Sequence, residues 1–149
     1  CKGTECDVAN DNCPNQVVVS GERNAVEDVL QRAKDAGARR AMPLALSAPV
    51  HCRIQAPAAD AMRAELANIT IAQPQAIFIA NKTAEPMTDV AEIKEELIYQ
   101  MTHGVRWRES VMTMHRLGIT EQIEIGPGNV LTGLASRICP EITAKKLEI

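Results

Sequence analysis

The sequence predicts an α/β domain with a largely parallel sheet. Runs rich in Val and Ile alternate along the chain with amphipathic segments of helical spacing, an order typical of parallel strands joined by helical crossovers. The 149 residues are enough for one domain with a sizeable core. Only Phe78, Tyr99 and Trp107 are aromatic, so aliphatic side chains and methionines must build that core.

The elements predicted in the first 46 residues form a β-α-β unit. Residues 1–16 are rich in Asn, Asp, Cys and Gly, a composition typical of turns and loops. The run QVVVSG predicts a buried strand over residues 16–21, and the apolar spacing of residues 22–37 predicts a helix that ends at a glycine. Residues 39–46, RRAMPLAL, predict a second strand, with Pro43 at an edge or a bulge.

Beyond this unit, helices and strands continue to alternate. Apolar residues at helical spacing predict helices over residues 57–68, 89–104, 106–118 and, after a Gly-Pro-Gly turn, 127–139. Short β-rich runs predict strands over residues 76–81 and 121–126, and residues 142–149 are expected to form a terminal strand or tail.

Charge, hydropathy and cysteine usage exclude several function classes. The formal net charge is −3, so the chain lacks the basic excess with which nucleic-acid-binding proteins displace phosphate counterions. No apolar run is long enough to span a membrane and no signal-peptide pattern is present. The five cysteines are odd in number and form no CxxC pair. They favour reduced thiols in a cytoplasmic protein and argue against a metal site.

His51 lies in the segment LSAPVHCR, between an apolar approach and a predicted helix. Pro49 biases the preceding residue toward extended backbone, so the histidine follows the end of an extended segment. Loops at such ends carry many functional side chains because rigid neighbours position them. From this stretch alone, the favoured interpretation is a half-buried histidine that satisfies a loop carbonyl.

Two motifs that often carry chemistry are absent or incomplete. The segment IEIGPGNVLTGL has glycines at positions 126, 128 and 133. That spacing departs from the dinucleotide-binding pattern, and no lysine follows as a P-loop requires. A tight strand-to-helix turn is the favoured interpretation. No serine of the chain stands in a G-x-S-x-G elbow, so the sequence contains no recognisable serine nucleophile.

Five segments together resemble one family, the malonyl-CoA:acyl carrier protein transacylases of bacterial type II fatty-acid synthesis. They are NDNCPNQVVVSG, AGARRAMPLALSAPVHC, PAADAMRAEL, VRWRESV and EIGPGNVLTGL. The resemblance is to the C-terminal half of the family and extends to about residue 138. It implies that residues 1–46 belong to a small ferredoxin-like subdomain and residues 47–149 to the C-terminal part of a hydrolase-like parallel α/β core. The chain begins with Cys rather than Met, and we expect it to be part of a longer protein.

The resemblance also implies a reaction. The family moves a malonyl group from coenzyme A to an active-site serine, and then to the phosphopantetheine thiol of acyl carrier protein. His51 matches the catalytic base, and the main-chain carbonyl of Gln100 matches the acceptor that orients it. The implied partners are malonyl-CoA, acyl carrier protein and the N-terminal half of the same enzyme, which would supply the serine. Coenzyme A enters as a thioester substrate, and no bound cofactor is expected.

Three further positions match residues that line the substrate cleft of the family. Asn10 and Asn12 match an N-x-N loop, although asparagines in a loop are equally good turn formers. Val50 precedes the histidine, where relatives often have Phe or Ser. A β-branched aliphatic residue leaves room of intermediate size there, so a preference for malonyl is expected.

A basic rim is the last feature that the resemblance implies. It would steer the acidic carrier protein toward the site, and its residues are Arg39, Arg40 and Arg137. Ordinary surface charge is the alternative. Three other functions remain open: an acyltransferase domain of a polyketide or multidomain fatty-acid synthase, a non-catalytic fragment that binds carrier protein, and, least favoured, a nucleotide-binding domain that uses the Gly-Pro-Gly turn.

Overall fold

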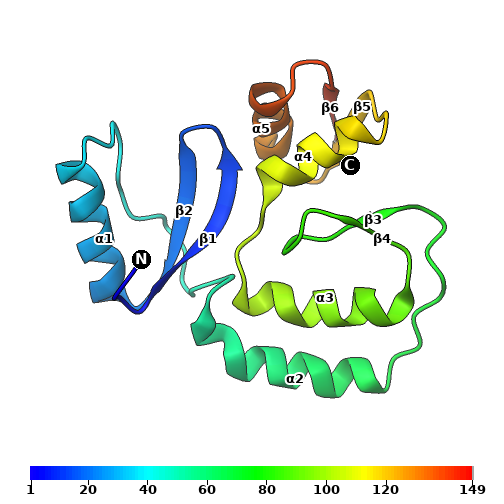
Figure 1. Ribbon diagram of the computed structural model, residues 1–149, viewed down its shortest axis with the longest axis horizontal. Coiled ribbons are helices and arrows are strands. Elements are labelled where there is room, and N and C mark those ends of the chain that lie inside the picture. The colour runs from blue at the N-terminus through cyan, green and yellow to red at the C-terminus, as the bar shows by residue number, and fades with distance from the viewer. Residues whose placement is uncertain (149) are drawn as a thin grey trace.

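The computed structural model describes residues 1–148 and contains small sheets surrounded by helices (Figure 1). In chain order the elements are β1 (Cys6–Cys13), β2 (Gln16–Gly21), α1 (Arg23–Asp35), the 3₁₀ turn η1 (Arg53–Gln55), α2 (Ala56–Ala67), β3 (Phe78–Ile79), β4 (Pro86–Met87), α3 (Val90–Thr102), α4 (Trp107–Arg116), β5 (Glu121–Ile125), α5 (Val130–Ile138) and β6 (Thr143–Leu147). The predicted α/β class is confirmed. The predicted division between residues 46 and 47 stays a prediction.

The strands form two-stranded sheets. β1–β2 and β3–β4 pair antiparallel, whereas β5–β6 pair parallel. Within residues 1–148, further parallel pairing is confined to a single bridge between Asn10 and Val105. The described residues therefore hold one short parallel ladder in place of the largely parallel sheet that the alternation of elements predicts.

The predicted loop over residues 1–16 is wrong, because β1 occupies half of it. β1 pairs with β2 through a tight turn in which Asn15 adopts a φ of +66°, a conformation that asparagine tolerates well. Cys6, Ala9 and Cys13 of β1 are buried, and the register shifts twice along the ladder. The turn-forming composition of this segment is thus overridden by pairing and burial.

The predicted strand over residues 39–46 is also wrong. This segment is irregular in the structure, and Met42, Leu44 and Leu46 are 48–63% exposed. Its aliphatic pattern suits a strand, but within residues 1–148 no neighbouring strand pairs with it. The strand predicted over residues 76–81 shortens to β3, Phe78–Ile79.

The predicted helices are confirmed, with ends shifted by a few residues. α2 has Pro57 in its first turn, where the missing N–H leaves no helical hydrogen bond unmade. Asp89 caps α3 by accepting a hydrogen bond from the Glu92 N–H at 3.0 Å. Gly118, with a φ of +82°, follows α4. The predicted C-terminal strand is confirmed as β6, and residue 149 lies outside the described residues.

Two apolar clusters hold these helices together. The first lies between α2 and α3, which run side by side (Figure 1), and centres on Ala59, Leu66 and Ile98. The second joins α4 and α5 and centres on Val111, Cys139 and Ile142. The centres of both clusters consist of aliphatic side chains and one cysteine, as the scarcity of aromatic residues predicts.

The β1–β2 hairpin is tied to the link between α3 and α4. The Val105 N–H donates to the Ala9 carbonyl at 2.8 Å, and the Asp11 N–H donates to the Val105 carbonyl at 2.9 Å. A Cβ at Gly104 would collide with the carbonyl oxygen of Val8, so only glycine permits this approach. The end of α3 is thereby fixed against β1.

Candidate active site

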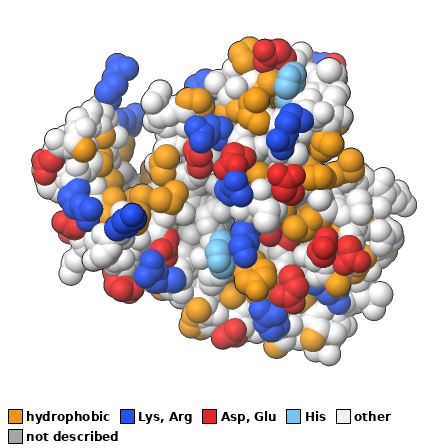
Figure 2. All heavy atoms as spheres, viewed as in Figure 1, with side chains coloured by type: hydrophobic (Ala, Val, Ile, Leu, Met, Phe, Trp, Pro, Cys, Tyr) orange, Lys and Arg blue, Asp and Glu red, His pale blue; other side chains and the backbone are white. Residues whose placement is uncertain are grey.

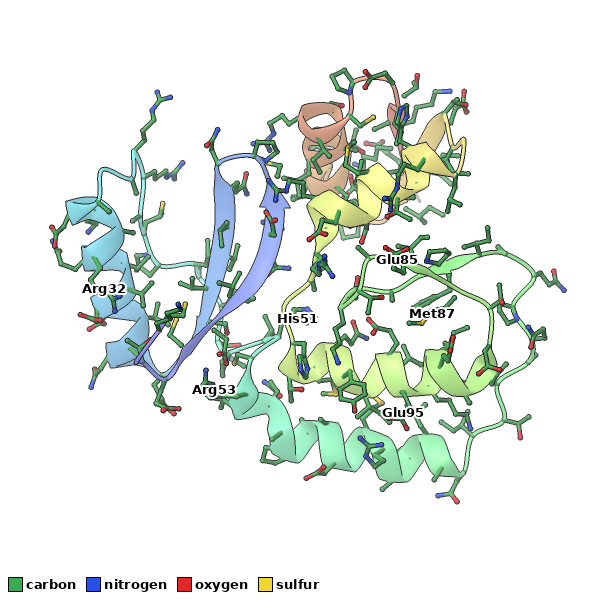
Figure 3. All side chains as sticks on the ribbon, in the orientation of Figure 1. Arg32, His51, Arg53, Glu85, Met87 and Glu95 are labelled. Atoms are coloured by element: carbon green, nitrogen blue, oxygen red, sulfur yellow. The ribbon has the colours of Figure 1, made fainter. Side chains whose placement is uncertain are left out.

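His51 occupies a strained position in the loop that leads into η1. Its φ is +52°, in the left-handed region that residues other than glycine rarely adopt. Such conformations persist where the surroundings impose them, and they cluster at functional sites. The ring is half-buried, and Figure 3 places it where the hairpin, the start of α2 and the end of α3 meet.

The His51 ring contacts the end of α3 through one hydrogen bond. Its Nδ1 lies 2.7 Å from the main-chain oxygen of Gln100, so the contact expected from the resemblance is present. Because a carbonyl oxygen can only accept, Nδ1 must carry the proton. In the neutral ring this leaves the Nε2 lone pair free. The arrangement suits a base that takes a proton at Nε2, a role that remains a prediction.

The position of Gln100 explains why its carbonyl is available. α3 ends at Thr102, so the carbonyl of Gln100 lies in the last turn, where helical carbonyls lack intrahelical donors. The same helix end carries partial negative charge, which favours a cation beside it. The side chain of Gln100 points elsewhere and accepts a hydrogen bond from the Asn81 amide at 2.6 Å.

The loop on both sides of His51 is anchored to the hairpin. The Val50 N–H donates to Ser20 Oγ at 3.0 Å, and the Arg53 N–H donates to the Asp7 carboxylate at 2.9 Å. The Arg53 side chain binds the same carboxylate, and this side-chain hydrogen bond holds the pKa of Asp7 below its usual value. Sequence reasoning missed these contacts because the partners are 30 and 46 residues apart.

Asn10 and Asn12 lie on strand β1, not in a loop as expected. Asn10 pairs with Val18 in the hairpin and bridges to Val105, and both asparagines are half-buried. Val50 is 41% exposed and lies directly beside His51. The roles of these residues toward a substrate stay predictions.

The three arginines of the expected basic rim do not form one cluster. Arg39 and Arg40 follow α1, whereas Arg137 lies on α5, on the other side of the hairpin (Figure 1). Arg137 donates to the Gly133 carbonyl at 3.0 Å and to the Gln16 side chain at 3.1 Å. Figure 2 shows basic and acidic side chains intermixed on the face in view. A docking role for these arginines stays a prediction.

A cavity of about 300 Å³ lies between α4 and β5 and extends to Asn81, the residue that binds the Gln100 side chain. Trp107 Nε1 and Gln122 Oε1 are buried and have no hydrogen-bond partner within the described residues, and both residues line the cavity. A buried donor and a buried acceptor without partners are costly. A polar group from outside residues 1–148 would satisfy them. Sequence patterns had not indicated this cavity.

The Gly-Pro-Gly turn is structural, as predicted. Gly126 and Gly128 have φ values of +134° and +88°. The carboxylate of Glu124 accepts from the Thr132 N–H and Oγ1, both at 2.8 Å, and from the Leu131 N–H at 3.2 Å. The α5 N–H groups that would bind a phosphate therefore already bind a carboxylate. This argues against the nucleotide-binding alternative.

Among residues 1–148, no group of three or more His, Cys, Asp or Glu side chains is arranged to hold a metal ion. None of the helices described by these residues has the length and apolar character needed to cross a membrane.

Comparison with known proteins places these features in a family context. A scan against protein-family models finds no match. The malonyl CoA-acyl carrier protein transacylase of Salmonella typhimurium is 42% identical over 138 residues, which are 93% of this chain and 45% of that protein. The transacylase of the same name from Bacillus subtilis is 41% identical over 137 residues, 92% of this chain and 43% of that protein.

Solved structures agree with the curated relatives. An acyl carrier protein S-malonyltransferase from Vibrio cholerae superimposes with a TM-score of 0.93 at 40% identity, covering 98% of this chain and 48% of that one. The chain is homologous to the C-terminal half of the malonyl CoA-acyl carrier protein transacylases. It spans about half the length of these transacylases. Another similar structure, with a TM-score of 0.91 and 38% identity, covers 99% of this chain and 47% of that one, and is a malonyl-transacylase in complex with a type II PKS acyl-carrier protein.

The cap at α5 predicts a pH-dependent contribution to stability. Hydrogen bonds from the Thr132 backbone hold the pKa of Glu124 below its usual value. The carboxylate therefore stabilises the fold above its unfolded pKa, about 4.3, and this contribution is lost as the pH falls through the lower folded pKa. Glu124→Gln should lower the urea midpoint of the chain at pH 7, and the difference from the unmodified chain should shrink toward pH 3.

Glu27→Gln, on the exposed side of α1, is the control and should leave the midpoint unchanged at both pH values. A Glu124→Gln deficit equally large at pH 7 and pH 3 would contradict a role for the ionised carboxylate.

Proposed function

We propose that this chain is the histidine-bearing half of an acyltransferase that transfers malonyl from malonyl-CoA to acyl carrier protein through a Ser-malonyl intermediate. One observation carries the proposal: the hydrogen bond between His51 Nδ1 and the Gln100 carbonyl. Homology to the C-terminal half of the malonyl CoA-acyl carrier protein transacylases supports it. The N-terminal half of the same enzyme supplies the serine nucleophile.

In the first half-reaction, Nε2 of His51 takes the proton of the serine hydroxyl as its oxygen attacks the malonyl thioester carbon. The resulting imidazolium is stabilised by the Gln100 carbonyl and by the negative end of α3. The carbon–sulfur bond then breaks. The imidazolium returns its proton to the departing coenzyme A thiolate, which leaves malonyl-serine and neutral His51.

The second half-reaction repeats these steps with a different nucleophile. Nε2 takes the proton of the phosphopantetheine thiol, whose sulfur attacks the malonyl-serine ester, and the imidazolium returns the proton to the serine oxygen. A neutral carbonyl stabilises imidazolium less than a carboxylate would, so activation of the nucleophile is moderate. We expect this to limit hydrolysis of the malonyl-serine ester.

The cavity between α4 and β5 is the place where the N-terminal half would dock. Trp107 Nε1 and Gln122 Oε1 need polar partners there, and Ile123 and Ile125 of β5 are 57% and 65% exposed. Exposed aliphatic residues of this size beside unsatisfied polar atoms are typical of a surface that another segment covers.

The remaining assignments belong to the same proposal. Asn10, Asn12 and Val50 contact the substrate, and the proximity of Val50 to His51 supports its place near the acyl group. Coenzyme A acts as a thioester substrate, and no bound cofactor is required. The five free cysteines support a cytoplasmic location.

A second candidate differs in the carrier protein. A structure similar to this chain is a malonyl-transacylase bound to a type II PKS acyl-carrier protein, which favours a polyketide pathway as the alternative setting. Transfer rates to fatty-acid and polyketide carrier proteins, measured side by side, distinguish the two settings.

His51→Ala tests the proposed base. The enzyme is a chimera in which this chain replaces the C-terminal half of the Salmonella typhimurium transacylase, and the readout is malonyl transfer to carrier protein. Loss of general-base catalysis should lower kcat by roughly 10²–10⁴, whereas His115→Ala, at the exposed end of α4, should leave it unchanged. A folded chimera that transfers malonyl equally well with and without His51 would refute the proposal.

Arg40→Glu tests the docking role of the basic rim. Reversal of this exposed charge should raise the KM for carrier protein several-fold at low salt and leave the KM for malonyl-CoA unchanged. The reason is that positive charge on the surface attracts the acidic carrier protein toward the site. Arg23→Glu, at the start of α1, is the matched control. Equal effects of the two variants on both KM values would rule out a specific role for Arg40.

A further inference from the structure

The loop that carries His51 is fastened to the β1–β2 hairpin at three residues around the histidine, Val50, Cys52 and Arg53. Before it, the Val50 N–H donates to Ser20 Oγ at 3.0 Å. After it, the fully buried Cys52 side chain lies 3.6 Å from the same Ser20 oxygen. One residue further on, the Arg53 N–H donates to Asp7 at 2.9 Å. His51 itself makes its polar contact on the other side, with α3.

The backbone conformation of His51 explains what these contacts do. A φ of +52° is unfavourable for a residue with a Cβ, so an unrestrained loop would relax to a negative φ. That rotation would swing the imidazole away from the Gln100 carbonyl. The conformation that presents Nδ1 to α3 must therefore be imposed by the residues on either side.

The contact between Arg53 and Asp7 fixes the geometry of the His51 loop more than it adds to the stability of the fold. The guanidinium Nε and Nη2 and the main-chain N–H of Arg53 converge on one Asp7 carboxylate, a planar fork that sets both distance and orientation. The Arg53 side chain is 55% exposed and that of Asp7 is 25% exposed. Because the Arg53 side chain is open to water, this ion pair contributes little to folding.

The same strand also fixes the partner of the histidine. Ala9 and Asp11 of β1 hydrogen-bond to Val105, just beyond the end of α3, while the Asp7 carboxylate binds Arg53. β1 therefore holds the His51 loop with one end and the α3 terminus with the other. Its rigidity sets the separation between Nδ1 and the Gln100 carbonyl.

We propose that Asp7 and Ser20 are positioning residues, which hold His51 in its left-handed conformation and keep its Nδ1 on the Gln100 carbonyl. Their side chains bind the backbone on either side of His51. The inference rests on the proposed function for its kinetic consequence, whereas its structural consequence, the orientation of the ring, is independent of any activity.

The kinetic test uses the chimeric enzyme with Asp7→Ala and Ser20→Ala. A displaced base lowers kcat, and we expect a loss of about 10-fold to 100-fold in each variant, with little change in the KM for malonyl-CoA. Ser20→Thr keeps the hydroxyl and should restore most of kcat. Glu95→Ala removes a more exposed ion pair, between Glu95 of α3 and Arg63 of α2, and should leave kcat unchanged.

The structural test follows the His51 ring by NMR in the 149-residue chain. The Nδ1 proton should exchange with solvent about 10-fold faster in Asp7→Ala and Ser20→Ala than in the unmodified chain, because local opening frees it. Glu95→Ala should have no effect on this exchange. An unchanged Nδ1 proton in both loop variants would overturn the inference, even if kcat falls.

The two tests separate this inference from the proposed function. If His51→Ala loses activity but the Nδ1 proton exchanges normally in Asp7→Ala and Ser20→Ala, the proposed function stands. The positioning role is then refuted. Faster Nδ1 exchange in those variants, with His51→Ala fully active, retains the positioning role and refutes the function.

Discussion

The proposed chemistry depends on one hydrogen bond, from His51 Nδ1 to the carbonyl oxygen of Gln100, 49 residues further along the chain. It joins a strained loop to the open end of a helix and fixes the tautomer of the ring. The helix supplies an acceptor because its last-turn carbonyls have no helical donors. The ring supplies a donor because β1 and β2 hold its backbone in the left-handed region.

The rest of the fold can be understood as support for that contact. The α2–α3 cluster places the end of α3 beside the start of α2, and the Val105 contacts fasten the same helix end to β1. The glycine at position 104 permits this approach because a side chain there would meet Val8. β5 and the cavity beside it carry exposed aliphatic residues and unsatisfied polar atoms, which fits a surface that another segment covers.

The helices and the strands β2, β5 and β6 were predictable from the residues alone. Apolar periodicity and terminal glycines mark α1 to α5 because these signals are local. β1 escaped prediction since its Asn and Asp residues are turn formers that become a strand only by pairing with β2. The aliphatic run over residues 39–46 wrongly predicted a strand. A strand requires a neighbouring strand to pair with, and residues 1–148 offer none there.

The site was predictable in a different way. His51 and Gln100 were named through a family resemblance, since a main-chain oxygen has no signature in residue type. The residue types of Asp7, Ser20 and Arg53 likewise give no sign of their role, because these residues reach their partners only after the chain folds. What the residues could indicate was the Gly-Pro-Gly turn, whose conformation depends on local glycines.

A measurement of the His51 tautomer shows whether the Gln100 carbonyl orients the ring. Nitrogen-15 NMR of the ring, recorded at a pH where the imidazole is neutral, distinguishes a proton on Nδ1 from one on Nε2. We expect the proton on Nδ1, shared with the Gln100 carbonyl, and a free lone pair on Nε2. A ring that carries its proton on Nε2, or that averages between the two tautomers, would contradict a base oriented by residue 100.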